Sequence, residues 1–340
     1  RDMYLDEKGN PIEGMSKLGA SASGVPGSVA GMFSTLPFAK MTMKKLLQPA
    51  YELAAGGFVI TESEARSLNA ERKNFINHSA QASAFTRKEN WKAGDTLYQP
   101  ELAATILRIQ QKGKAGFYEG ETAAMIVEEM KNSKGVISLE DLKKYTPKFR
   151  KPIEFDYRGH HIISFAPPSS GGILIAQMMQ MIAPYPVTAM GANTFESVSL
   201  MVEAQRRAYA DRAEFMGDQD FVKVPVKTLS SAAYLKERMK DFVPGKATPS
   251  ESVSPGKVNP ESEETTHLSV ADQYGNVVSV TTTLNGGYGS KTVVGGAGFL
   301  MNNEMDDFSV KPGVANMYGA VGKEANAIQA GKRMLSSMTP

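Results

Sequence analysis

The 340-residue chain contains no cysteine. This absence excludes disulfide bonds, a thiol nucleophile, thiolate-bound metals and iron–sulfur clusters. Only four histidines are present (His78, His160, His161 and His267), and the sequence has no HExxH motif. We therefore predict no metal site and no cofactor, and any nucleophilic side chain of this protein has to be an oxygen.

Long apolar runs and an excess of one charge are also missing. The longest apolar candidate, residues 173–182, is shorter than the ~18 residues of a membrane span and contains two glutamines. The net charge of +2 favours neither nucleic acid nor membrane as a partner. With 41% hydrophobic and 22% charged residues, the composition is that of a globular protein with one large domain or two modest ones.

Two motifs of common enzymes are absent as well. No GxSxG elbow occurs, which argues against an α/β-hydrolase. The glycines of 286–289 and 295–298 match neither GxGxxG nor a P-loop, so they do not predict a phosphate cradle.

Apolar spacing predicts helices in the first half of the chain, at 43–54, 100–112 and 121–131. Pro49 predicts a kink or a break in the first of them. A capping box at Ser138 predicts the start of a further short helix. Residues 1–35, rich in glycine, serine and proline, are expected to form loops and turns.

Alternating apolar residues then predict a hairpin over 153–165, and a second hairpin over 266–284. A long helix is expected at 194–215, and residues 247–264 have the Pro, Ser, Glu and Lys composition of an exposed linker. This order of helices and hairpins predicts an α+β or layered α/β fold.

The linker ends at Glu264, and the second hairpin begins at once with Thr265 and Thr266. A threonine hydroxyl needs a neighbouring base, and the α-amine of a chain that begins with threonine supplies one. Its pKa of roughly 7.7–8.0 suits general-base work. Cleavage of the Glu264–Thr265 bond would create that amine. The alternative is that both threonines simply begin a strand.

Three other features each allow two interpretations. The polar run 302–307 is either a site for a cation or amino group, or a solvated turn. Ser336 and Ser337 offer two hydroxyls to a carboxylate, although such a pair alone is uninformative. His267 is either a base or a structural histidine.

Taken together, the sequence resembles the γ-glutamyltranspeptidases, a family of N-terminal nucleophile hydrolases. The matching stretches are 1–3 (RDM), 167–172 (PPSSGG), 209–212 (YADR), 265–270 (TTHLSV), 281–285 (TTTLN), 301–309 (MNNEMDDFS) and 332–338 (KRMLSSM). The resemblance implies a four-layer αββα sandwich and a precursor cut before Thr265. Residues 1–264 would then belong to a large subunit, and residues 265–340 to a small one associated with it.

The same resemblance implies roles for individual residues. Thr265 would be the nucleophile in self-cleavage and again on the substrate, with Thr283 hydrogen-bonded to it. Arg1, Ser336 and Ser337 match residues that hold the substrate α-carboxylate. The α-amino group would be held by Asn285, Glu304 and Asp307. Residues 311–318 resemble a lid loop with Tyr318 as its gate.

A γ-glutamyl group ends in a zwitterion, and burying both charges requires a paired partner for each. The implied activity is hydrolysis and transfer of γ-glutamyl groups from glutathione and related amides, with water, amino acids or dipeptides as acceptors. Rival hypotheses are an acylase for another amide, such as a glutaryl β-lactam, and an uncleaved non-catalytic precursor or fragment. A periplasmic or extracellular location is implied.

The chain begins with Arg1 rather than methionine and ends at Pro340 without a polar tail. We expect it to be the middle of a longer precursor. The glycine pair that forms the family's oxyanion hole would lie beyond Pro340.

Overall fold

The computed structural model describes residues 1–249, 252–253 and 266–339. These residues form two compact units. The first unit contains residues 1–12, 149–282 and 306–340, and the second contains 13–148 and 283–305. Both units take residues from either side of position 264, so they do not coincide with the two subunits expected from cleavage at that position. The division into subunits stays a prediction.

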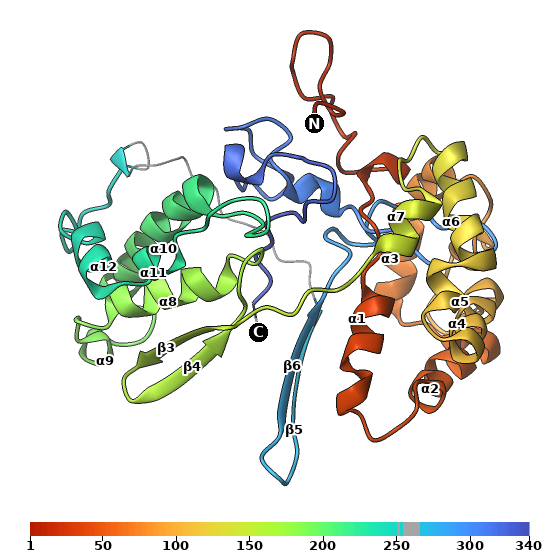
Figure 1. Cartoon of the computed structure of the whole chain (residues 1–340), viewed down its shortest axis with the longest axis horizontal. Helices are drawn as coiled ribbons and strands as arrows, with labels where there is room; N and C mark the ends of the chain where they lie inside the picture. Colours follow the sequence, from red (N-terminus) through yellow and green to blue (C-terminus); the bar gives the residue numbers. More distant parts are fainter. Residues whose placement is uncertain (250–251, 254–265, 340) are drawn as a thin grey trace. The chain divides into compact units, whose positions relative to one another are not determined.

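The second unit is mainly helical (Figure 1). Its helices are α1 (Ser28–Thr35), α2 (Met43–Gly56), α3 (Glu62–His78), α4 (Pro100–Lys112), α5 (Ala115–Tyr118), α6 (Gly120–Asn132) and α7 (Leu139–Lys144). The two short strands β1 (Phe58–Val59) and β2 (Thr96–Leu97) pair antiparallel. One apolar core of this unit lies around Ile126 and Met301, and another lies around Phe75 and Trp91.

The predicted helices at 43–54, 100–112, 121–131 and after Ser138 are confirmed, with their ends moved by no more than a few residues. Helix α2 continues through Pro49, so of the predicted kink or break the break is wrong and the kink stays a prediction. The prediction of loops over 1–35 is also wrong for α1. The Tyr118 hydroxyl accepts from Ala30 N at 3.2 Å and donates to Pro26 O at 2.7 Å, and such a distant partner has no sequence signal.

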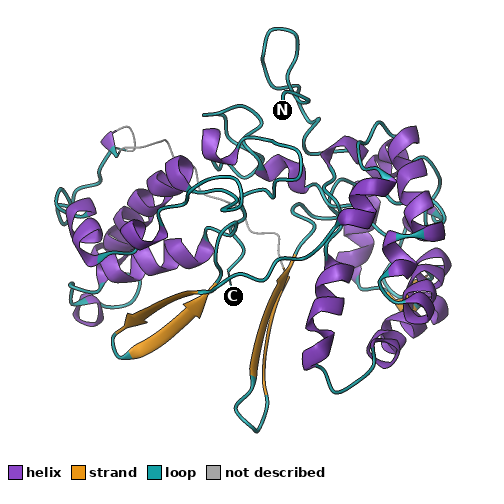
Figure 2. Ribbon diagram, viewed as in Figure 1, coloured by secondary structure: helices purple, strands orange, loops and turns teal. Residues whose placement is uncertain are grey.

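The first unit contains hairpins and helices (Figure 2). Its strands are β3 (Ile153–Tyr157), β4 (His160–Ser164), β5 (Thr266–Ala271) and β6 (Val277–Thr282), and its helices are α8 (Gly171–Ile182), α9 (Val187–Met190), α10 (Phe195–Phe215), α11 (Val226–Leu229) and α12 (Ala232–Arg238). Both predicted hairpins and the long helix are therefore confirmed. In the described residues each sheet has two antiparallel strands, so the α+β class is seen directly.

Helix α8 packs against β3 and α10 around Ile173, Leu174 and Ala208. Its first residues, Gly171 and Gly172, allow this close approach. A Cβ at Gly172 would collide with the carbonyl oxygen of Phe165, and one at Gly171 would collide with Thr339. The glycine pair of the 167–172 motif thus allows the chain before α8 and the chain near residue 339 to lie close to the helix.

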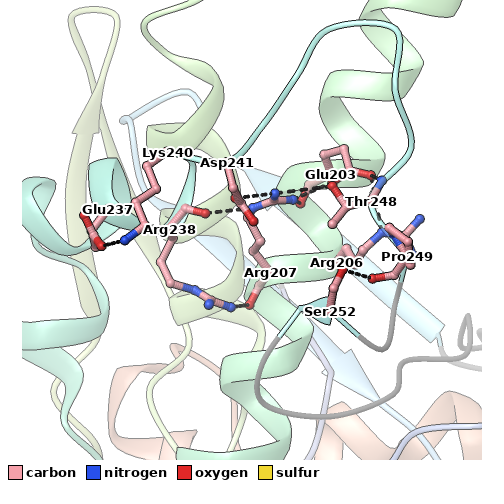
Figure 3. Close-up of polar contacts among 10 residues, drawn as sticks. All are labelled: Glu203, Arg206, Arg207, Glu237, Arg238, Lys240, Asp241, Thr248, Pro249 and Ser252. Carbon is pink, nitrogen blue, oxygen red and sulfur yellow. Dashed lines mark hydrogen bonds and ion pairs between the residues drawn. The ribbon is translucent and has the colours of Figure 1, made fainter.

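A buried polar network crosses α10 in the same unit (Figure 3). The Arg207 side chain is only 1% exposed, and its guanidinium pairs with Glu203 at 2.5 Å and with Asp241 at 2.7 Å. Glu203 also accepts from Thr248 N at 2.9 Å. Burial raises the pKa of Glu203, but the bonds from Thr248 and Arg207 outweigh it and the net pKa is lowered. The network therefore ties α10 to residue 248.

Candidate active site

The predicted nucleophile Thr265 and the preceding Glu264 lie outside the described residues. Strand β5 begins at the next residue, and its first pair is Thr266 with Thr282. Thr283 follows directly after Thr282, the last residue of β6. Thr283 Oγ1 accepts a hydrogen bond from Asn285 N at 2.9 Å, which orders the chain as it leaves β6.

In the second unit, Asn285 and Asn303 join two segments that include predicted site residues. Asn285 is 6% exposed and has a φ of 72°. Its side-chain amide donates to Asn303 O at 3.0 Å, and Asn303 N donates to Leu284 O at 3.0 Å. Asn303 Oδ1 accepts from Gly286 N at 2.8 Å, so residues 284–286 lie beside residue 303.

Glu304 follows directly, in the short 3-10 helix η5 (Glu304–Asp307). Asn302 Oδ1 accepts from Glu304 N at 3.1 Å and from Gly24 N at 2.9 Å. Asn303 and Asp306 are each 1% exposed. The interpretation of residues 302–307 as a solvated turn is therefore wrong, because a solvated turn does not bury its amides and carboxylates.

Asp307 lies at the other end of η5, in the first unit. Asn326, which is 3% exposed, donates from Nδ2 to Asp307 O at 2.7 Å and accepts at Oδ1 from Leu335 N at 2.9 Å. One buried amide therefore connects the backbone of Asp307 with the residue before Ser336. Nothing in the sequence pattern marked Asn326, since a single asparagine in a loop has no periodic signal.

Arg1 contacts the same turn. Its guanidinium pairs with Glu324 at 2.5 Å, and residues 324–326 form the 3-10 helix η6. Lys332 donates from Nζ to Ala325 O at 2.8 Å and to Ala327 O at 3.0 Å. Burial lowers the pKa of Lys332, and the positive charge of nearby Arg1 lowers it further. The charges of Asp218 and Glu324 raise this pKa, but the net shift is downward. This end of the unit therefore has two cationic side chains close to the Glu324 carboxylate.

Ser336 and Ser337 are held against the chain that precedes α8. Ser336 N donates to Pro168 O at 3.0 Å, and Ser336 O accepts from Ser170 N at 2.7 Å. Arg212, 5% exposed, donates to Ser170 Oγ at 3.1 Å and to Ser337 Oγ at 3.0 Å. Three separate motifs of the sequence, at 167–172, 209–212 and 332–338, thus meet in one hydrogen-bonded group.

Tyr318 lies on the loop that was expected to form a lid. Tyr318 N and Ala320 N donate to Asn316 Oδ1 at 3.0 and 2.9 Å. Asn316 Nδ2 donates to Asp307 Oδ1 at 3.1 Å, and Met317 N donates to Asp306 Oδ2 at 2.7 Å. The loop is therefore bonded to two consecutive carboxylates of η5.

Each unit thus contains part of the predicted set. In the first, Arg1 and Asp307 are bonded to residues 324–326, and Tyr318 is linked to Asp307 through Asn316. Ser336 and Ser337 follow Leu335, which is bonded to Asn326, and are themselves held by the chain before α8 and by Arg212. The second contains Thr283, Asn285 and Glu304 close to Asn302 and Asn303. His267 on β5 lies 2.9 Å from both Thr281 Oγ1 and Ser269 Oγ.

In the part of the chain that the structure describes, no group of His, Asp and Glu side chains could hold a metal ion. None of the described helices is long and apolar enough to cross a membrane.

The family model of gamma-glutamyltranspeptidase matches residues 1–340. The chain belongs to this family. It is 44% identical to the glutathione hydrolase proenzyme of Escherichia coli K12 over 344 residues, an alignment that covers 100% of this chain and 59% of that relative. The chain therefore spans well under two thirds of that relative's length.

Two further comparisons bear on fold and chemistry. The crystal structure of Helicobacter pylori gamma-glutamyltranspeptidase superposes with a TM-score of 0.73, at 38% identity over 76% of this chain and 74% of that one. The fold is thus that of the N-terminal nucleophile hydrolases. The acylase ACY 1 proenzyme of Pseudomonas sp. V22 is 35% identical, over 95% of this chain and 56% of that relative.

Proposed function

We propose that the full-length protein is a γ-glutamyltransferase and glutathione hydrolase. It would cut its own chain at Glu264–Thr265 and act through a γ-glutamyl ester on Thr265. The observation that carries the proposal is the framework around 324–326. It joins Arg1, Asp307 and Leu335, the residue before the Ser336–Ser337 pair, in one unit of a chain that matches the family along its whole length.

The chemistry follows from a free threonine amine. The α-amine takes the proton from Thr265 Oγ, and the oxygen attacks the γ-carbonyl carbon. The amide C–N bond then breaks, and the leaving nitrogen receives that proton. Water or an amine attacks the ester, which releases glutamate or a new γ-glutamyl amide. Thr283 supplies a hydroxyl close to the nucleophile.

The proposed clamp recognises both charges of the donor. Arg1 carries five N–H donors in a planar fork, which suits a carboxylate, and Ser336 and Ser337 add hydroxyls. The Arg1–Glu324 pair is exposed, so exchanging Glu324 for a substrate carboxylate would cost little. Asn285, Glu304 and Asp307 would bind the ammonium, and Tyr318 would close over it.

The partners follow from the same proposal. Donors are glutathione and other γ-glutamyl compounds, and acceptors are water, amino acids and dipeptides. The two halves of the cut precursor stay associated, as the interleaving of residues from both sides of position 264 within each unit supports. We place the protein in the periplasm or outside the cell.

A second candidate is an acylase for an amide without an α-amino group, which the similarity to acylase ACY 1 favours. Such a substrate would bring no ammonium group for Glu304 and Asp307 to bind. An uncleaved, non-catalytic precursor is the remaining alternative, and it would appear as one band rather than two on a denaturing gel.

The test compares two anilides that differ only in the α-amino group, γ-glutamyl-p-nitroanilide and glutaryl-p-nitroanilide. The full-length protein should prefer the γ-glutamyl anilide by at least about 100-fold in kcat/KM. This preference is expected because the glutaryl group has no ammonium to bind the proposed carboxylates, so that charge-assisted contact is lost. Equal rates, or a preference for the glutaryl anilide, would favour the acylase instead.

A further inference from the structure

Asn316 bonds to two parts of the molecule at once. Its Oδ1 accepts from the backbone of Tyr318 and Ala320, while its own N donates to Ala320 O at 2.9 Å. These bonds close the turn that carries Tyr318. The other end of the amide, Nδ2, donates to Asp307 Oδ1 at 3.1 Å. The same side chain therefore shapes the loop and touches a carboxylate of the proposed ammonium site.

The neighbouring residues add a second attachment at the same place. Met317 N donates to Asp306 Oδ2 at 2.7 Å, and the Asp306 side chain is buried. Burial, followed by the Asp306 charge, raises the pKa of Tyr4, which keeps that phenol neutral. Because Met317 is bonded to Asp306, the loop stays attached at residue 317 even when Asn316 does not reach Asp307. The two attachments can therefore be tested separately.

An amide donor on Asp307 is compatible with an ammonium ion on the same carboxylate. A carboxylate has two oxygens with about four lone-pair sites, and an amide N–H occupies one of them. Its effect is to hold the carboxylate plane in one orientation. Loss of such a contact weakens recognition of a charged partner, since the group must be ordered again when the partner binds.

We propose that Asn316 is a positioning residue that couples the loop carrying Tyr318 to the ammonium-binding carboxylate Asp307. The loop and the carboxylate then behave as one element, and donor recognition depends on the amide between them. This inference rests on the proposed function, because it assigns to Asp307 the α-amino group of a γ-glutamyl donor. The side-chain hydrogen bonds of Asn316 run to Asp307 and to the backbone of its own loop, so we expect it to act on donor binding rather than on the chemical step.

The experiment uses Asn316→Ala and Asn316→Ser in the full-length protein. Alanine removes both functions of the amide. Serine keeps a hydroxyl that can still accept from the turn, but it is too short to reach Asp307. Asn276→Ala is the matched control, since it makes the same substitution and removes an asparagine–aspartate hydrogen bond, Asn276 Nδ2 to Asp272 Oδ2 at 2.8 Å, in the exposed β5–β6 turn of the same unit. KM and kcat are measured with γ-glutamyl-p-nitroanilide, and kcat/KM with glutaryl-p-nitroanilide.

Both Asn316 variants should raise KM for the γ-glutamyl anilide about 5- to 10-fold, with kcat within about 2-fold of the parent, since one hydrogen bond to a charged group is lost. The preference over the glutaryl anilide should fall by the same factor, and Asn276→Ala should match the parent. If Asn316→Ser restores KM, or both anilides are affected equally, Asn316 only shapes the loop and the proposal is wrong.

The two levels of the hypothesis fail differently. A parent protein that stays uncut, or that releases no nitroaniline from the γ-glutamyl anilide, overturns the proposed function and this inference with it. An active parent with unchanged Asn316 variants overturns only the coupling.

Discussion

Replacing Thr265 with alanine should leave the precursor as one chain and abolish γ-glutamyl hydrolysis. The hydroxyl is the proposed nucleophile for both reactions, and no cysteine is present to replace it. Removing the nucleophile of a catalytic group that acts as a unit costs on the order of 10³-fold or more in rate. Denaturing gel electrophoresis and intact-mass spectrometry report the cut, and release of nitroaniline from the γ-glutamyl anilide reports the activity.

Thr266→Ala is the matched control, because it alters the adjacent threonine. Thr266 is exposed and pairs with Thr282 in the β5–β6 hairpin, so its loss should change strand stability only slightly. That variant should be cut and active. Thr265→Ser retains a hydroxyl and should keep part of both activities. A Thr265→Ala protein that is still split before residue 265, or still releases nitroaniline, would refute the assignment.

The second large effect concerns the buried ion pair of α10 (Figure 3). Arg207→Ala should lower the free energy of unfolding by about 3–5 kcal/mol. Without the guanidinium, the buried carboxylate of Glu203 loses its closest cation, and Arg238 O loses a donor at 2.7 Å. Burial lowers the pKa of Arg207, but Asp241 and Glu203 outweigh it and raise the net value. Guanidinium denaturation followed by circular dichroism measures the loss.

Two further variants separate the charge from the packing. Lys240→Ala removes the ion pair between Lys240 and Glu237, whose side chains are both exposed. Because exposed ion pairs contribute little to stability, this variant should leave the denaturation midpoint unchanged. The double variant Glu203→Gln with Arg207→Met removes both charges and should be more stable than Arg207→Ala alone. If Arg207→Ala is no more destabilising than Lys240→Ala, the buried pair does not stabilise this unit.

Local sequence patterns were sufficient for much of the secondary structure. Pro100 and Gly113 bracket α4, and Arg158 with Gly159, both at positive φ, close the β3–β4 turn. Helix α3 was not predicted, because its 17 residues are mostly polar. The capping box from Thr61 to Glu64 was the signal that marked its start.

The candidate site, like the secondary structure, could be predicted from the sequence only in part. Its chemistry-bearing residues stand in contiguous motifs, so the resemblance of these motifs to the family predicted Thr265, Asn285, Glu304, Asp307 and the Ser336–Ser337 pair. The partners of the residues that hold them in place have no such local signal, even where the residue itself stands in a motif. Arg212 reaches Ser337 across 125 positions, and Asn303 reaches Lys17 across 286.

What the sequence by itself determined is therefore most of the helices and both hairpins, and the family, while the reacting groups are a prediction from its motifs. Each of these depends on residues within a few positions of one another. The tertiary structure alone decided which polar side chains support those groups. Asn326 is bonded to both Asp307 and Leu335, and Asn316 is bonded to both the loop of Tyr318 and Asp307. Such bonds join segments that meet only after folding, because a single asparagine in a loop encodes neither its partner nor its distance from it.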